Sequence, residues 1–206
     1  MRLAVLGASG HGKVVADSAE LLGWNSVTFF DDAWPPLKNN GPWAIAGDIT
    51  HLLDRITDFD GVVIAIGNNH IRAEKQKRLG DAGAKLVTLV HPSAVISAYA
   101  SLGEGVVVFG NAVVNASAVV GAGVIINTGA VIEHDCVIDE FAHVSPNAAL
   151  AGGVNVGREA WVGACASVRQ LLTVGAGAVV GMGAVVTRDV PSGLTVLGSP
   201  AKTLAR

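Results

Sequence analysis

The chain is poor in the residues that mark several common classes of protein. Aromatic residues make up 5% of its 206 residues, and charged residues make up 15%. The two cysteines, Cys136 and Cys165, are too few for a disulfide framework and lack the spacing of a metal site. We therefore expect a protein of a reducing compartment, the cytoplasm, and we expect no metal centre.

A strong charge of either sign is also missing. The formal net charge is −3, so the chain has no overall positive field to attract nucleic acid or acidic lipid. No stretch reaches the roughly 18 apolar residues of a membrane-spanning helix. The short apolar run after Arg2 lacks the layout of a signal peptide. The sequence therefore predicts neither nucleic acid nor a membrane as a partner.

Small and aliphatic residues are abundant instead. Half of the residues are hydrophobic, and 26 are glycine. Because β-branched side chains pack well on pleated strands, this composition favours stacked strands over a helical bundle.

The first 90 residues alternate between strand-like and helix-like patterns. The sequence predicts strands over 2–6, 26–30, 61–66 and 85–90, a Gly-rich turn over 7–12, and helices over 14–22, 49–55 and 70–79. This rhythm is typical of βαβ units with a parallel sheet. We therefore predict a small Rossmann-like α/β domain over residues 1–90.

A strict six-residue repeat begins after this segment. Every sixth residue from Ile96 to Val186 is Ile, Leu or Val, and most residues two positions earlier are small. A six-residue period is typical of a parallel β-helix, in which three hexapeptides complete one triangular coil. We predict a left-handed parallel β-helix over residues 91–206, with the segment after Asp189 as its C-terminal cap.

The turn at residues 7–12 has the spacing G-x-x-G-x-G. Glycines between a strand and a helix expose backbone N–H groups at the helix N-terminus, which favours anion binding. The spacing differs from the dinucleotide motif G-x-G-x-x-G, and 90 residues leave room for one mononucleotide-binding half. The N-terminal domain therefore suits a nucleotide sugar better than NAD.

The order and spacing of several short motifs resemble the sugar acetyltransferases of the sialic acid O-acetyltransferase type, within the hexapeptide-repeat superfamily. The resemblance is greatest to enzymes that N-acetylate nucleotide-linked 4-amino-4,6-dideoxy sugars in the bacillosamine or perosamine pathway. It implies an acetyltransferase that uses acetyl-CoA. From the fold we expect a homotrimer with active sites between subunits, because cyclic association buries the flat sides of such a prism. The motifs are residues 7–12, Asp31-Asp32, residues 66–69, Asn127-Thr128, residues 133–135 and residues 198–202.

The resemblance assigns the role of general base to His134. Transfer to an amine needs a base that takes a proton as nitrogen attacks the thioester, and histidine titrates near neutrality. Asp135 follows His134 where a UDP-sugar relative carries Glu, and a neighbouring carboxylate raises the basicity of an imidazole.

The resemblance also assigns ligand-binding residues. Acetyl-CoA is expected at His143, Asn127, Ala164 and Met182, with the small residues Gly163, Gly181 and Gly183 allowing its close approach. Lys202 and Arg206 are candidates for its phosphates. Trp161 follows His143 by three hexapeptides, which places it directly above His143 on the predicted coil. The nucleotide sugar is expected at Ser9, Gly10, His11, Asp31, Asp32 and Gly67.

Three other functions remain open at this point. The acceptor could be a hydroxyl of sialic acid or another sugar. A zinc hydrolyase of the carbonic anhydrase type needs three His ligands, and the repeats contain His134 and His143 alone. A non-catalytic nucleotide-sensing or scaffold protein would need no His at all. The sequence does not choose among UDP, GDP and dTDP sugars.

Overall fold

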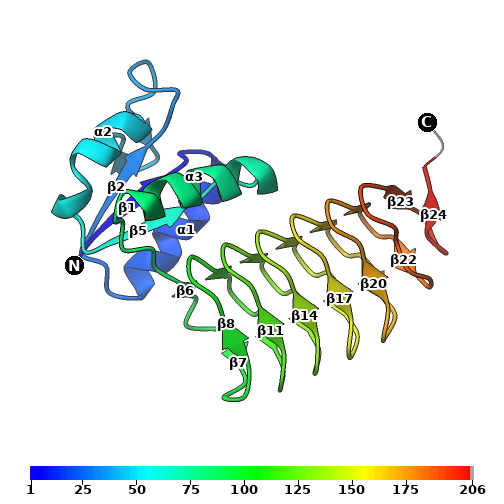
Figure 1. The fold of residues 1–206 in the computed structure, drawn as a ribbon. Coiled ribbons are helices and arrows are strands. Elements are labelled where there is room, and N and C mark those ends of the chain that lie inside the picture. The colour runs from blue at the N-terminus through cyan, green and yellow to red at the C-terminus, as the bar shows by residue number, and fades with distance from the viewer. Residues whose placement is uncertain (205–206) are drawn as a thin grey trace. The chain divides into compact units, whose positions relative to one another are not determined.

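The computed structural model describes residues 1–204. The chain divides into two compact units, one from Met1 to Pro92 and one from Ser93 onwards (Figure 1). No helix within residues 1–204 is long and apolar enough to cross a bilayer.

The N-terminal unit is built on a three-stranded parallel sheet. The strands β1 (Arg2–Leu6), β2 (Ser26–Phe30) and β5 (Gly61–Ile64) lie in the order β2-β1-β5. β1 and β5 are almost continuously buried, as expected of strands in a parallel sheet covered on both faces. The predicted small parallel sheet is therefore confirmed.

Helices and short elements complete this unit. The helices are α1 (Gly10–Leu21), α2 (Ile49–Asp54), α3 (Asn69–Asp81) and the 3₁₀ helix η1 (Ile56–Asp58), and the short strands are β3 (Asn39–Asn40), β4 (Trp43–Ala44) and β6 (Leu89–Val90). The strand predicted over 85–90 is wrong in extent. It forms an isolated bridge between Val62 and Leu86, and then β6.

Close packing explains two glycines of the turn between β1 and α1. Gly7 has φ +111°, and a Cβ there would lie 2.6 Å from the carbonyl oxygen of Ala65. A Cβ at Gly12 would collide with the carbonyl oxygen of Gly7. Both residues therefore let α1 begin directly above β1, as only glycine fits these positions.

The second unit is a parallel β-helix whose coils stack from β7 to β24 (Figure 1). Residues pair with those three hexapeptides away, as in Val113 with Val131 and His143 with Trp161. The predicted left-handed β-helix is confirmed. From Val108 to Val186 the inward column is buried, for example at Ile126 and Ile132, whereas Ile96 and Leu102 in the first coil are partly exposed.

Its strands form three faces. The first face contains β7 (Val95–Ile96), β10 (Val113–Val114), β13 (Val131–Ile132), β16 (Ala149–Leu150), β19 (Ser167–Val168) and β22 (Val185–Val186). The second contains β8 (Ser101–Leu102), β11 (Val119–Val120), β14 (Val137–Ile138), β17 (Asn155–Val156) and β20 (Thr173–Val174). The third contains β9 (Val107–Val108), β12 (Ile125–Ile126), β15 (His143–Val144), β18 (Trp161–Val162), β21 (Val179–Val180), β23 (Thr195–Leu197) and β24 (Lys202–Thr203).

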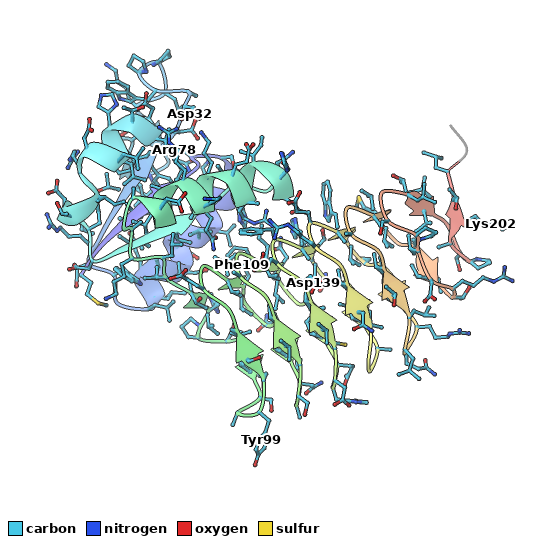
Figure 2. The ribbon with its side chains drawn as sticks, in the orientation of Figure 1. Asp32, Arg78, Tyr99, Phe109, Asp139 and Lys202 are labelled. Atoms are coloured by element: carbon cyan, nitrogen blue, oxygen red, sulfur yellow. The ribbon has the colours of Figure 1, made fainter. Side chains whose placement is uncertain are left out.

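The corners between faces also carry exposed side chains. Tyr99, 82% exposed, points away from the first coil at one such corner (Figure 2). Backbone bonds between coils hold the corners in register, since Asp135 N–H donates to the Ala116 carbonyl and Gly153 N–H donates to the His134 carbonyl. The β-helix ends where β23 pairs antiparallel with β24, which carries Lys202 (Figure 2).

Candidate active site

His134 and Asp135 form the corner between β13 and β14. Asp135 has φ +59°, in the left-handed region that Asp tolerates better than most residues. The side chains of His134 and Asp135 are 64% and 66% exposed. The two residues therefore stand on the surface of the prism, accessible to a ligand.

The imidazole of His134 has a defined hydrogen-bonding state. Its Nδ1 lies 2.7 Å from Oδ2 of Asp135. Because an ionised carboxylate can only accept, Nδ1 carries the hydrogen and Nε2 presents the lone pair. The hydrogen bond that His134 donates to Asp135, and then the negative charges of Asp135 and Glu133, raise the pKa of His134 above its ordinary value. The arrangement suits a base that takes a proton at Nε2.

Glu133 is anchored from the preceding coil, because Asn115 Nδ2 donates to Glu133 Oε2 at 3.0 Å. Sequence reasoning gave neither residue a role. The signal was present, since the two residues are three hexapeptides apart and must stack.

A second polar group lies on the third face of the prism. His143 in β15 is 8% exposed, and its ring stacks on Trp161 with centroids 5.7 Å apart and planes within 5°. Trp161 Nε1 donates to Ser145 Oγ at 2.7 Å. The predicted position of Trp161 above His143 is confirmed, and Ser145 is a partner that sequence reasoning missed.

Asn127 determines which nitrogen of His143 carries the hydrogen. The N–H of Thr128 donates to Asn127 Oδ1 at 2.9 Å, so Oδ1 is the accepting end of the amide. The other end, Nδ2, lies 3.2 Å from His143 Nε2 and must donate to it. His143 Nε2 is therefore an acceptor, and its hydrogen lies on Nδ1. The structure thus brings Asn127 and His143 together, as the resemblance implied.

Ala164 and Met182 occupy the same corner of successive coils. The carbonyl of Ala164 already accepts the N–H of Gly183 at 2.8 Å. Within residues 1–204, no backbone bond uses the N–H of Ala164 or of Met182. Met182 is 79% exposed. This corner can therefore donate two N–H groups to a ligand that runs along it.

The structure gives Gly163 and Gly181, near this corner, a reason to be glycine other than close approach of a ligand. A Cβ at Gly163 would lie 2.6 Å from the carbonyl oxygen of Val180, and one at Gly181 would collide with Leu197. Stacking of the coils therefore requires Gly163, whereas at Gly181 the end of the Leu197 side chain fills the space. Gly183 has φ +65° and open space around it. Lys202 lines a terminal pocket of ≈ 240 Å³ with Arg188 and Pro191, while Arg206 lies outside the described residues.

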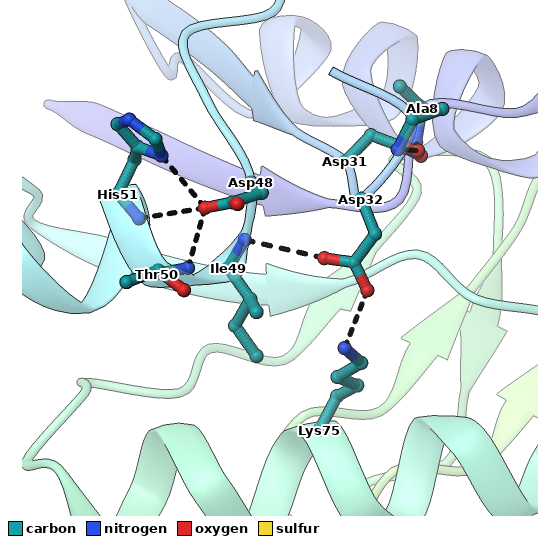
Figure 3. Close-up of polar contacts among 9 residues, drawn as sticks. Ala8, Asp31, Asp32, Asp48, Ile49, Thr50, His51 and Lys75 are labelled. Atoms are coloured by element: carbon teal, nitrogen blue, oxygen red, sulfur yellow. Dashed lines mark hydrogen bonds and ion pairs between the residues drawn. The ribbon is translucent and has the colours of Figure 1, made fainter. Parts of the chain in front are cut away.

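In the N-terminal unit, Asp31 shapes the turn after β2. Its carboxylate accepts the N–H of Ala8 at 2.6 Å (Figure 3). It also accepts the N–H of Ala33 at 2.9 Å. It therefore ties the Gly-rich turn to the neighbouring strand end. In the same region Asp48 caps α2 by accepting from Thr50 and His51 (Figure 3).

Asp32 is paired with Lys75 from α3. Oδ2 of Asp32 lies 2.7 Å from Lys75 Nζ, and the Lys75 side chain is 20% exposed (Figure 3). Both residues line a pocket of ≈ 120 Å³ together with Gly7, Asp31 and the apolar side chains of Leu6, Ile66 and Ile71. Whole-ligand sites usually exceed ~300 Å³, so this pocket has room for part of a nucleotide. Sequence reasoning missed Lys75, because a lysine in a charged helix gives no distinguishing signal.

The remaining predicted substrate residues do not line this pocket. Ser9 precedes α1 without a side-chain capping bond, and its carbonyl accepts from Asn40 Nδ2 at 3.1 Å. Gly10 opens α1 with no atom within 4 Å of where its Cβ would be. Gly67 accepts at its carbonyl from Arg72 Nη1 at 3.3 Å.

His11, in the first turn of α1, is held neutral at pH 7. Burial, and then the nearby charge of Arg72, lower the pKa of His11 from its ordinary 6.5 to about 4. Arg72 itself is 1% exposed and also donates to the carbonyl of Ile66 at 2.9 Å and to Asn69 Oδ1. Arg72, which sequence reasoning did not single out, therefore connects His11 with the Gly67 turn.

No cluster of three or more His, Cys, Asp or Glu side chains arranged to hold a metal ion is found among residues 1–204. Cys136 lies in the core and donates to the Ala151 carbonyl, whereas Cys165 is exposed at a corner.

Comparison with known proteins covers the whole chain. Residues 2–79 match the PglD N-terminal domain family. The acetyltransferase domain of PglB from Neisseria gonorrhoeae is 42% identical, with a TM-score of 0.94, 98% of this chain and 99% of that chain covered. A mutant of perosamine N-acetyltransferase from Caulobacter crescentus, in complex with CoA and GDP-perosamine, is 36% identical, with a TM-score of 0.96. The match covers 100% of this chain and 98% of that chain.

A curated relative matches over a shorter stretch. UDP-N-acetylbacillosamine N-acetyltransferase of Bacillus subtilis is 39% identical over 112 residues, which span 52% of this chain and 50% of the relative. The match thus spans half the length of that curated relative. The full-length structural matches establish that the chain belongs to the β-helical sugar N-acetyltransferase family that includes the PglB acetyltransferase domain and perosamine N-acetyltransferase.

Proposed function

We propose that this protein transfers the acetyl group of acetyl-CoA to the 4-amino group of a nucleotide-linked 4-amino-4,6-dideoxy sugar, with His134 as the general base. The observation that carries this proposal is the His134–Asp135 pair. Asp135 fixes the hydrogen on Nδ1 and raises the pKa of the imidazole, so the Nε2 lone pair of this exposed side chain stands ready to accept a proton.

The reaction follows from this arrangement. The amino nitrogen of the sugar attacks the thioester carbonyl, and Nε2 of His134 takes a proton from that nitrogen. The carbonyl forms again as the carbon–sulfur bond breaks, and the CoA thiolate leaves with a proton returned by the imidazolium. Asp135 stabilises the imidazolium while it carries the proton. The products are the acetamido sugar and CoA.

Acetyl-CoA is proposed to lie along the third face and the corner that follows it. His143 and Asn127 form the polar end of this path, and the N–H groups of Ala164 and Met182 donate to the ligand beyond it. Two relatives support the ligand class, since the PglB domain has been solved with acetyl-CoA and the perosamine enzyme with CoA.

The N-terminal unit, proposed as the domain over residues 1–90, would bind the nucleotide. Asp32 and Lys75 together offer an acceptor and a donor beside apolar walls, which suits the polar edge of a base or sugar. Ser9, Gly10, His11, Asp31 and Gly67 are proposed to complete the binding surface. The perosamine enzyme, solved with GDP-perosamine, supports a nucleotide sugar as the acceptor.

We also propose that the enzyme is a homotrimer that acts in the cytoplasm, with each active site between two subunits. The flat faces of the prism carry apolar outward residues such as Val95, 62% exposed, and Val119, 48% exposed. Side-by-side association of prisms would bury such residues. Sedimentation should give three times the monomer mass, and a stable monomer with full activity would contradict this assembly.

The function is tested by following thiol release from acetyl-CoA with a panel of acceptors. The panel contains UDP-, GDP- and dTDP-linked 4-amino-6-deoxy sugars and free sialic acid. We expect turnover on one nucleotide-linked amino sugar, with the acetyl group found on nitrogen by NMR of the product. Turnover confined to sialic acid, with the acetyl group on oxygen, would favour the hydroxyl-acceptor alternative. No turnover on any acceptor would contradict the proposal.

A further inference from the structure

The ring of His134 rests on the backbone of the next coil. Gly152 follows His134 by three hexapeptides and occupies the same corner position one coil later. A Cβ built on Gly152 would lie 2.5 Å from Cε1, 2.6 Å from Nε2 and 3.2 Å from Nδ1 of His134. No real Cβ approaches a ring so closely, so the space that Gly152 leaves vacant is the space that the imidazole fills.

Neither the backbone nor the repeat explains this glycine. Gly152 does not have a positive φ, unlike its neighbour Gly153 at +69°. The same corner position holds Ala116 one coil before His134 and Gln170 one coil after Gly152. The corner therefore accepts a Cβ in other coils, and glycine stands where the His134 ring needs the room.

We propose that Gly152 is a positioning residue for His134, because its missing side chain lets the imidazole lie over the backbone with Nδ1 hydrogen-bonded to Asp135 and the lone pair on Nε2. This inference rests on the proposed role of His134 as the base. The atoms that a Cβ would displace include both ring nitrogens. A methyl group at position 152 therefore changes the bond to Asp135 and the direction of the proton-accepting lone pair together.

The test compares Gly152→Ala with Gly80→Ala. Gly80 lies in α3, and a Cβ there makes an ordinary contact of 3.6 Å with Leu86. Both variants gain one methyl group, but only the first one meets His134. Two quantities are measured for each: steady-state kinetics by thiol release, and the titration of His134 by NMR of labelled histidine.

In Gly152→Ala we expect kcat to fall on the order of 100-fold, as for a catalytic group displaced by about 1 Å. KM for acetyl-CoA should stay within about 2-fold. The titration midpoint of His134 should move down, because the ring loses its hydrogen bond to Asp135 while the charges of Asp135 and Glu133 remain nearby. Gly80→Ala should match the wild-type protein in both measurements. Wild-type kcat and an unchanged His134 titration in Gly152→Ala would overturn the proposal.

Two further outcomes are separated by design. If the wild-type protein has no acetyltransferase activity, the proposed function fails, but the His134 titration still tests whether Gly152 positions the imidazole. If Gly152→Ala does not fold, the double variant His134→Ala/Gly152→Ala shows whether the added methyl group clashes with the His134 ring or with the backbone. Recovery of folding shows that the methyl group clashes with the ring, whereas a double variant that also fails to fold shows that the backbone itself needs glycine and overturns the proposal.

Discussion

Lowering the pH should destabilise the N-terminal unit through His11. This residue has a pKa of about 4 in the folded protein and an ordinary value of 6.5 when unfolded, because burial and the charge of Arg72 oppose its protonation. Between these two values the unfolded chain binds the proton and the folded chain does not. Stability is therefore complete above about pH 7 and is lost as the pH falls through 6.5 toward 4.

The size of the effect follows from the two pKa values. At about 1.4 kcal/mol for each pH unit, the free energy of unfolding falls by about 3 kcal/mol once the pH is below 4, where both the unfolded and the folded chain bind the proton. At pH 5 the loss is about 2 kcal/mol. Other groups also titrate in this range, so the contribution of His11 must be isolated by comparison with His11→Gln.

The assay is urea unfolding followed by tryptophan fluorescence at pH 7.5 and pH 5. Three of the four tryptophans, Trp24, Trp34 and Trp43, lie in the N-terminal unit and report its unfolding. The wild-type protein should lose about 2 kcal/mol more than His11→Gln between the two pH values. His70→Gln, at an exposed position of α3, is the control for loss of an imidazole. The same pH dependence in wild-type protein and His11→Gln would refute the reasoning.

Three further changes test the sites and the core. Lys75→Met removes the cation that pairs with Asp32, and KM for the nucleotide sugar should rise about 10-fold, as for loss of one charge-assisted bond; the reasoning fails if KM for acetyl-CoA changes instead. Asp135→Asn keeps a residue that tolerates the left-handed corner but removes the charge that raises the pKa of His134. The acidic limb of the pH profile of kcat/KM should therefore move to lower pH, and a profile that coincides with that of the wild type would argue against the pair. Ile132→Ala empties a fully buried position and should lower the free energy of unfolding by about 2–5 kcal/mol; a loss below about 1 kcal/mol in urea unfolding would contradict the inward assignment.

The fold was predictable wherever a fixed period governs the chain. The six-residue repeat sets the register of the coils, and that register alone places Trp161 on His143. The helices at 49–55 and 70–79 were found nearly as predicted. The strand over 85–90 was overestimated, because an apolar run does not reveal how much of it finds a pairing edge.

The site was less predictable where it depends on packing between elements. Lys75 reaches Asp32 from a helix 43 positions away, and no local pattern announces that contact. Gly163 and Gly181 were expected to admit the cofactor, yet the adjacent coils occupy the space beside them. Gly152, in contrast, could have been found by counting three hexapeptides from His134, since the register of the coils was already known.

Single-turnover kinetics of His134→Ala show whether His134 is the base for acetyl transfer. Wild-type protein and variant are mixed with saturating acetyl-CoA and the preferred amino sugar, and release of CoA thiol is followed across pH 6 to 9. We expect the variant to bind both substrates as the wild type does but to react on the order of 10²–10⁴-fold more slowly, without the acidic limb that we expect in the wild type. Transfer at the wild-type rate in the variant would show that the base is another residue.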